Sequence, residues 1–120
     1  MSLELLQESL RAFAQEREWE QFHNPKNLVM ALASEVGELS EVFQWLTQDE
    51  AATVMTNERK ADLVREELAD VFGYVLRIAD VLSVDLEEAL TAKIAVNADK
   101  YPVNLARGSA AKYTEYGGLT

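Results

Sequence analysis

Apolar residues at helical spacing are the feature that most constrains this fold. From residue 28 to residue 46 they recur every three or four positions, which places them on one face of a helix. The chain has only two prolines and five glycines in 120 residues, and no run shows the sustained alternation that is typical of a strand. Apolar residues make up 48 % of the chain, which suits one core at this length. The sequence predicts an all-α protein, most simply a four-helix bundle.

The helix boundaries are marked by capping signals. Asn24 precedes Pro25, which fits an N-cap followed by proline at the first helical position. Asp85 precedes Glu88 by three residues, which is the spacing of a capping box. We expect long helices at about residues 2–17, 24–46, 57–82 and 85–102.

The segments between and after the predicted helices indicate the domain organisation. Residues 47–56 have room for a short extra turn, and the stretch from Asn104 onward is expected to be irregular. We therefore predict one helical bundle domain over residues 1–103 and a C-terminal tail over residues 104–120.

Charge and composition exclude several classes of partner. The net charge of −10 argues against binding to nucleic acid, whose phosphates are also negative. No run of about 18 apolar residues is present and the N-terminus lacks a secretory pattern, so we expect no membrane span and no signal. The chain has no cysteine, which excludes disulfides and thiolate metal sites. We expect a cytoplasmic protein.

Several acidic residues fall on apolar helix faces. At about 100° per residue, Glu35 lies inside the apolar arc of its helix, Glu38 lies at the edge and Glu41 lies on the polar side. On the helix at 57–82, Glu67 and Asp70 lie inside the arc. Two inward acid pairs on two helices therefore face the predicted interior.

Inward carboxylates need compensation, because burying an ion costs several kcal/mol and like charges repel. A hard divalent cation would offset both effects, and oxygen ligands suit Mg²⁺, with Mn²⁺ as a substitute. The alternative is that both helices are rotated and the acids form a solvated edge.

Other polar and aromatic residues also have two interpretations. Lys93 and Asn97 lie on the apolar stripe of the helix at 85–102, where Lys93 fits either an ion pair with an acid or contact with a phosphate. Trp19 and Phe22 fit either core packing or stacking on a nucleobase. His23 is the only histidine, so a histidine-rich metal site is excluded.

Three segments resemble a known family. "WEQFHNPKNLVMALASEVGELSEVFQW", "EELADVFGYVL" and "NADKYPVNLARGSAAKYTE" are similar to the MazG-like, all-α nucleoside triphosphate pyrophosphohydrolases, and within these to dCTP pyrophosphatases. The similarity covers about residues 15–115. The family pattern is ExxE on one helix and ExxD on the next, matched by Glu35 and Glu38, then Glu67 and Asp70.

The resemblance implies Mg²⁺-dependent hydrolysis of a deoxynucleoside triphosphate, dCTP or a modified dCTP, to the monophosphate and pyrophosphate, as nucleotide-pool house-cleaning. It implies that the four acids are metal ligands, with Glu38 or Glu41 orienting the attacking water. Homodimers or dimers of dimers are expected. The implied substrate-binding residues are Trp19, His23, Trp45, Tyr74, Lys93, Asn97 and Tyr101. The tail residues Arg107, Lys112 and Tyr113 match without an assigned role.

Two other interpretations compete with this one. A di-iron bundle of the ferritin type needs Glu-x-x-His pairs, and the single histidine lies outside both acid helices. A non-enzymatic helical adaptor, whose acidic face binds a basic partner, would need no metal site.

Overall fold

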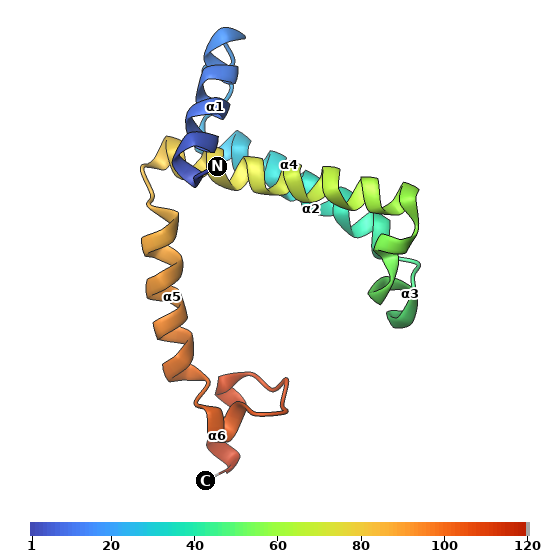
Figure 1. The fold of residues 1–120 in the computed structure, drawn as a ribbon. Coiled ribbons are helices and arrows are strands. Elements are labelled where there is room, and N and C mark those ends of the chain that lie inside the picture. The colour runs from blue at the N-terminus through green and yellow to red at the C-terminus, as the bar shows by residue number, and fades with distance from the viewer. Residues whose placement is uncertain (120) are drawn as a thin grey trace. The chain divides into compact units, whose positions relative to one another are not determined.

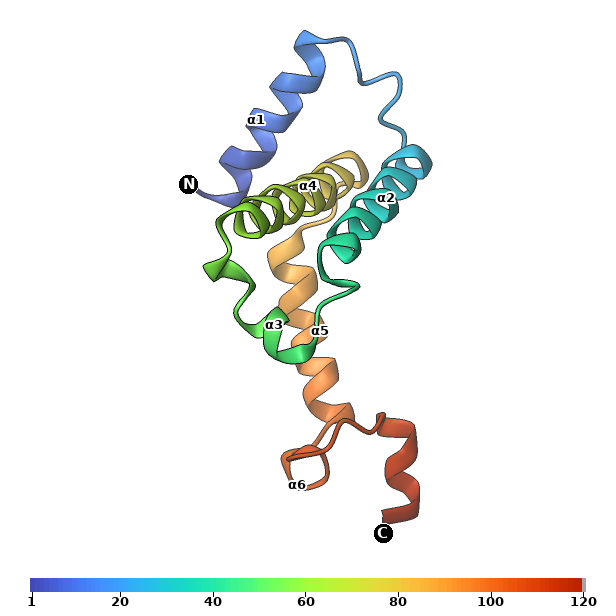
Figure 2. The same ribbon diagram turned by 90° about the vertical axis from the view of Figure 1, so that its right-hand side faces the viewer.

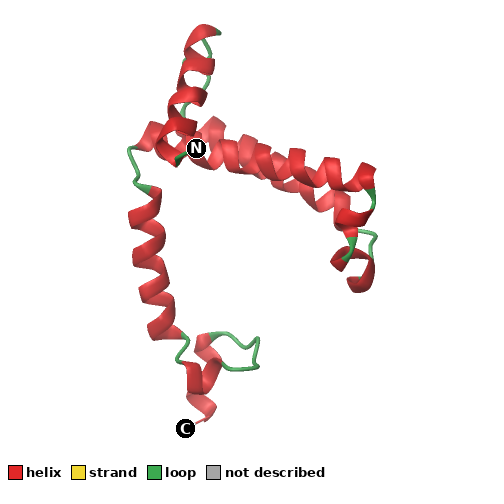
Figure 3. Cartoon of the chain, in the orientation of Figure 1, coloured by secondary structure: helices red, strands yellow, loops and turns green. Residues whose placement is uncertain are grey.

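The computed structural model describes residues 1–119, with side chains up to residue 117. All the described elements are helical (Figures 1 and 3), which confirms the predicted all-α class. In chain order they are α1 (Leu3–Glu16), α2 (Pro25–Phe43), α3 (Gln48–Ala52), η1 (Val54–Thr56), α4 (Glu58–Leu82), α5 (Leu86–Lys100), α6 (Val103–Ala106) and η2 (Tyr113–Leu119). None of the described helices combines the length and hydropathy that a membrane span requires.

The chain divides into two compact units. The first comprises residues 1–84, and the second begins at residue 85. The first unit holds α1, α2 and α4, and the second holds α5. The predicted domain limit at residue 103 stays a prediction.

Two long antiparallel helices form the centre of the first unit. Helices α2 and α4 run side by side along their length (Figures 1 and 2). Helix α1 packs against the C-terminal part of α4, where Gln7 Nε2 donates a hydrogen bond of 3.1 Å to the Leu76 carbonyl. The buried apolar residues of this unit are Ala14, Leu28, Val54, Ala61, Val64, Leu76 and Ala79.

Side-chain caps begin the main helices. A side-chain oxygen of each N-cap residue accepts a hydrogen bond from the backbone N–H three residues later, which satisfies one of the free donors of the first turn. Thr47 and Glu50 form a complete capping box at α3, with distances of 3.1 and 3.0 Å. The short turn predicted within residues 47–56 is thus confirmed. The capping residues are Ser2, Asn24, Thr47, Asn57 and Asp85.

Helices α1 and α4 end in left-handed residues other than glycine. Glu18 has φ 55° and Ser83 has φ 56°. After α1, the Trp19 N–H bonds to the Ala14 carbonyl at 2.9 Å, and after α4 the Val84 N–H bonds to the Ala79 carbonyl at 2.8 Å. These are Schellman bonds, which satisfy carbonyls at a helix end. The turn at Glu18 directs the chain into the segment that carries Trp19.

The second unit is more ordered than predicted. The expectation that residues 104–120 are irregular is wrong in part, because α6 and η2 occupy much of that stretch. The Tyr101 ring packs edge-on against Tyr113 and Tyr116, with centroid distances of 6.0 and 5.9 Å. Tyr116 is buried, so these aromatic contacts give the segment a small apolar centre.

Candidate functional site

Three glutamates converge between α2 and α4. At least one carboxylate oxygen from each of Glu35, Glu38 and Glu67 lies within 4.8 Å of those of the other two. We call these residues the acidic cluster. Glu35 and Glu67 are half-buried and Glu38 is exposed. The antiparallel pairing of the two helices therefore brings together residues separated by about thirty positions in sequence.

The acidic cluster contains polar atoms that lack partners. Glu35 Oε2 and Glu67 Oε2 are buried and have no hydrogen-bond partner among the described residues. Burial, the side-chain contact with Glu38 and the charges of Glu38, Asp70 and Glu67 raise the pKa of Glu35 to about 7. Burial and the neighbouring Glu38 and Asp70 also raise the pKa of Glu67. Each raised pKa means that the folded chain disfavours the charged form.

A divalent cation fits this arrangement. The donors are all carboxylate oxygens, which suit Mg²⁺, and the two buried oxygens without partners are free to coordinate. The alternative of a solvated edge fits Glu38 and Asp70, which are exposed. It does not fit Glu35 and Glu67, each of which has a buried carboxylate oxygen. The predicted burial of the acids is thus correct for one residue of each pair.

A cavity of about 270 Å³ lies next to Asp70 in the same unit. Three predicted substrate-binding residues, Trp19, His23 and Tyr74, line it together with Asp70. Asp70 also acts electrostatically on Glu35, so the cavity and the acidic cluster adjoin. The other lining residues are Leu10, Phe13, Ala14, Ala69, Gly73 and Arg77.

The aromatic residues before α2 do not belong to the core. Trp19 is 43 % exposed and packs edge-on against Phe13, with a centroid distance of 5.7 Å. Phe22 is 59 % exposed. The core-packing interpretation is therefore wrong for both. The partly open Trp19 ring lines the cavity, where it is available to a planar ligand.

A network of alternating charges borders the cavity. Arg11 contacts the Asp80 carboxylate through two nitrogens, at 2.6 and 2.9 Å. Arg77 Nη1 donates to Asp80 at 3.1 Å, and Arg77 Nε donates to His23 Nδ1 at 3.1 Å. We call these four residues the arginine network.

The arginine network shifts the protonation of its members. The hydrogen bond from Arg11, followed by the charges of Arg11 and Arg77, lowers the pKa of Asp80 against an opposing effect of burial. Burial and the charge of Arg77 lower the pKa of His23, while Glu20 opposes them.

Sequence reasoning missed Arg77. A signal was available, because Arg77 lies seven residues after Asp70 and so occupies nearly the same helix face. It also precedes Asp80 by three residues, which is a spacing at which helix side chains meet.

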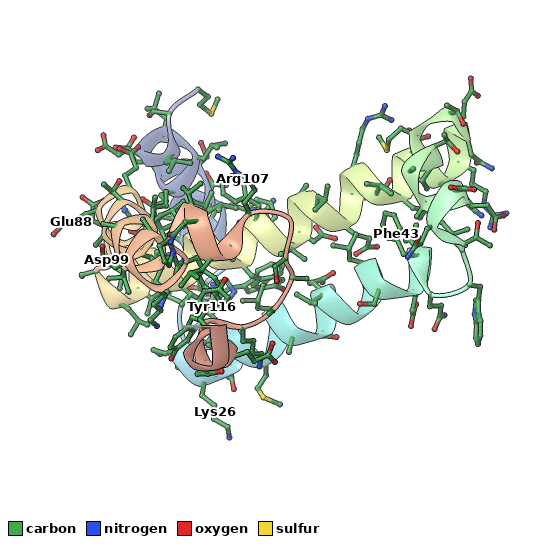
Figure 4. The ribbon with its side chains drawn as sticks, turned by 90° about the horizontal axis from the view of Figure 1, so that it is seen from below. Lys26, Phe43, Glu88, Asp99, Arg107 and Tyr116 are labelled. Carbon is green, nitrogen blue, oxygen red and sulfur yellow. The ribbon has the colours of Figure 1, made fainter. Side chains whose placement is uncertain are left out.

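The other predicted site residues are not among those that line this cavity. Trp45 is 86 % exposed and follows the end of α2 opposite to His23; Figure 4 labels Lys26 and Phe43 near those two ends. Glu41 lines a separate hollow together with Arg59 and Lys60. Lys93 and Asn97 are exposed on α5, and Tyr101 packs among tyrosines of the second unit.

The comparison with known families shows the family of the chain. A sequence model of the MazG-like family matches residues 30–116, which include all four predicted acidic ligands. The chain belongs to the MazG-like family. Within it, the chain is 48 % identical to human dCTP pyrophosphatase 1 and 47 % identical to the Bos taurus protein of the same name, each over 103 residues. The matches cover 86 % of this chain and 61 % of each relative's length.

A solved structure supports the fold of this MazG-like chain. A pyrophosphatase from Archaeoglobus fulgidus is similar to it, with a TM-score of 0.77 and 42 % sequence identity. The similarity covers 82 % of this chain and 91 % of that one. The fold of MazG-like proteins therefore describes most of the chain.

Proposed function

We propose that this chain is a Mg²⁺-dependent nucleoside triphosphate pyrophosphohydrolase, which converts a deoxynucleoside triphosphate and water to the monophosphate and pyrophosphate. The observation that carries the proposal is the acidic cluster, where carboxylates from two helices converge and two buried oxygens have no partner. The names of the similar dCTP pyrophosphatases favour dCTP or a modified dCTP as substrate. A cytoplasmic role in the nucleotide pool is part of this proposal.

The neighbouring cavity suits the base of such a substrate. Trp19 and Tyr74 offer aromatic surfaces, and the volume of about 270 Å³ lies just below the range of small-ligand sites, which begins at about 300 Å³. Asp70 lines the cavity and acts electrostatically on Glu35, so a nucleotide with its base against Trp19 would extend its phosphates toward the glutamates. The cavity would thus hold the base and the acidic cluster would lie at the triphosphate end of the nucleotide.

The acidic residues have distinct tasks in this proposal. Glu35, Glu38, Glu67 and Asp70 hold Mg²⁺, which neutralises phosphate charge and acidifies water when bound. Glu38 is the exposed member of the cluster, which supports the proposal that its carboxylate also orients the attacking water and accepts its proton. Glu41 is less suited, since it lies in the separate hollow beside Arg59 and Lys60.

The chain is also proposed to act as a homodimer or a dimer of dimers. Large apolar side chains on α2 and α4 are exposed, including Met30 at 64 %, Leu68 at 51 % and Phe72 at 44 %. Exposed apolar side chains on this helix pair support an interface there, and a second copy would cover them. Light scattering after gel filtration should give the mass of two or four chains. The mass of one chain would contradict this part.

The activity is tested by incubating the purified chain with each common dNTP and NTP in Mg²⁺. We expect pyrophosphate as the released product, with the highest rate for dCTP, and no release with a chelator. Glu38→Gln should abolish turnover in a folded protein, whereas the control Glu41→Gln, one helical turn away, should keep it. Orthophosphate as the product, no turnover across the panel, or an active Glu38→Gln protein would contradict the proposal.

A further inference from the structure

The contact between Arg77 and His23 fixes the position of a proton. Arg77 Nε carries a hydrogen and donates it to His23 Nδ1 at 3.1 Å. A guanidinium is always protonated and has no acceptor, so Nδ1 must offer a lone pair. The tautomer assigned from this bond carries its hydrogen on Nε2. A doubly protonated ring would lose the bond and place a second positive charge beside Arg77.

Arg77 itself is held rigidly. Its side chain is 9 % exposed, and its Nη1 donates to Asp80 at 3.1 Å. Arg11 contacts the same carboxylate from α1 with two bonds. Two helices therefore fix the guanidinium that contacts the His23 ring, even though His23 belongs to a loop.

The Nε2 edge of the His23 ring is open to a ligand as far as the described residues show. Within the described part of the chain, Nε2 makes no hydrogen bond, although His23 lines the cavity beside Trp19. The charged or titratable groups near the ring are Arg77, Glu20, Asp70 and Tyr74. Burial and the charge of Arg77 both disfavour the imidazolium.

We propose that Arg77 is a positioning residue that holds His23 as a neutral Nε2–H donor, which selects ligands with a hydrogen-bond acceptor such as a pyrimidine carbonyl. The ligand part of this proposal rests on the proposed function, while the tautomer is a property of the protein alone. Arg77 acts through the imidazole, and the pairing with Asp80 keeps the guanidinium in place.

The tautomer is measured by ¹⁵N NMR of the imidazole in tag-free protein labelled at histidine. His23 is the only histidine, so each imidazole signal belongs to it. At neutral pH and without substrate, we expect Nε2 to be protonated and Nδ1 to be an unprotonated acceptor. A wild-type protein with hydrogen on Nδ1, or on both nitrogens, would overturn the proposal whatever the enzyme assay gives.

Variants separate positioning from general stability. Arg77→Met should give tautomer-averaged signals and an imidazolium that forms at higher pH. Arg11→Gln removes an arginine from the same network but leaves the Arg77–His23 bond, so its His23 signals should remain those of wild type. Unchanged His23 signals in a folded Arg77→Met protein, or equal changes in both variants, would overturn the proposal. If Arg77→Met does not fold, the wild-type spectrum decides.

The consequence for binding is tested by a double-mutant cycle. Arg77→Met should raise KM for the preferred nucleotide roughly threefold to tenfold, the range of one neutral hydrogen bond, with a smaller effect on kcat. In a His23→Asn background the same substitution should leave KM nearly unchanged, since the histidine is absent. Full additivity of the two substitutions would overturn the link between Arg77 and His23. An inactive wild type would refute only the proposed function.

Discussion

The acidic cluster and the arginine network both place carboxylates on α4, yet they differ in how charge is balanced. In the arginine network, Asp80 accepts hydrogen bonds from two arginines. In the acidic cluster, three glutamates face one another, and two buried oxygens have no hydrogen-bond partner in the described part of the chain. Asp80 therefore has a lowered pKa, whereas Glu35 has a raised one.

The paired charges of the arginine network stabilise the fold, whereas the like charges of the acidic cluster oppose it. A paired carboxylate favours the folded state, because unfolding exposes it to water without its partners. A cluster of like charges disfavours the folded state until a cation is bound. Neutralising an acid should therefore have opposite effects in the two regions.

Asp80→Asn should cause the largest change in stability. The amide removes the charge between two arginines and leaves the buried Arg77 uncompensated. We expect a loss of about 2–3 kcal/mol in the free energy of unfolding, below the cost of a fully buried pair because Arg11 is partly exposed. Urea unfolding measures it. A loss under about 0.5 kcal/mol would mean that the network does not stabilise the fold.

Glu35→Gln should act in the opposite direction in chelator. The amide removes one of the repelling charges and keeps the size of the side chain, so the melting temperature of the metal-free protein should rise by a few degrees. Addition of Mg²⁺ should raise the melting temperature of wild type but not that of the Glu35→Gln variant. A lower melting temperature in chelator would show that Glu35 stabilises the fold in its charged form.

The pH dependence of the metal-free protein should also separate the two regions. The pKa of Glu35 is about 7 in the folded chain against an ordinary value of 4.5, so the folded state holds extra protons in this window. Stability should fall as pH rises through it. The pKa of Asp80 is lowered, so its contribution is present above its ordinary value of 3.8 and disappears as the pH falls further.

Melting curves in chelator measure this pH dependence. Wild type should melt higher near pH 5.5 than near pH 7.5, and Glu35→Gln should reduce the difference. Asp80→Asn should retain it. The lowered pKa of His23 acts in the opposite direction in this window, so the comparison with Glu35→Gln decides: an equal pH dependence in wild type and Glu35→Gln would contradict the repulsion in the acidic cluster.

The smallest effects concern the left-handed helix ends. Glu18→Gly and Ser83→Gly should each stabilise the protein by about 0.5–1 kcal/mol, because glycine removes the steric cost of a positive φ. Neither residue belongs to the acidic cluster or the arginine network, so Mg²⁺ should raise the melting temperature of both variants as in wild type. Destabilisation would show that the Glu18 or Ser83 side chain contributes more than its backbone strain costs.

The helices were predicted well, because they depend on local spacing, whereas the burial of the acids was predicted correctly only for Glu35 and Glu67. The periodicity of α2 and the Asn24 and Asp85 caps are read within one helix. The approach of Glu67 to Glu35 also followed, since two apolar arcs that each contain acids must face one another.

The arginine network depends on contacts that local spacing does not contain. Arg11 and Asp80 are 69 residues apart, and the His23–Arg77 bond joins a loop to a helix. The local sequence around each of these residues does not indicate which residue it will contact. The tail was mispredicted for a similar reason, since Tyr116 becomes buried through its contact with Tyr101.

Calorimetric titration with Mg²⁺ tests the central claim, that the acidic cluster is a cation site, most directly. Wild type should bind Mg²⁺ without nucleotide, and Glu67→Gln should lose most of this binding. The control is Glu66→Gln, which changes the adjacent, exposed glutamate on α4 and should bind as wild type does. Absence of binding in wild type, or equal binding in Glu67→Gln and Glu66→Gln, would contradict the account.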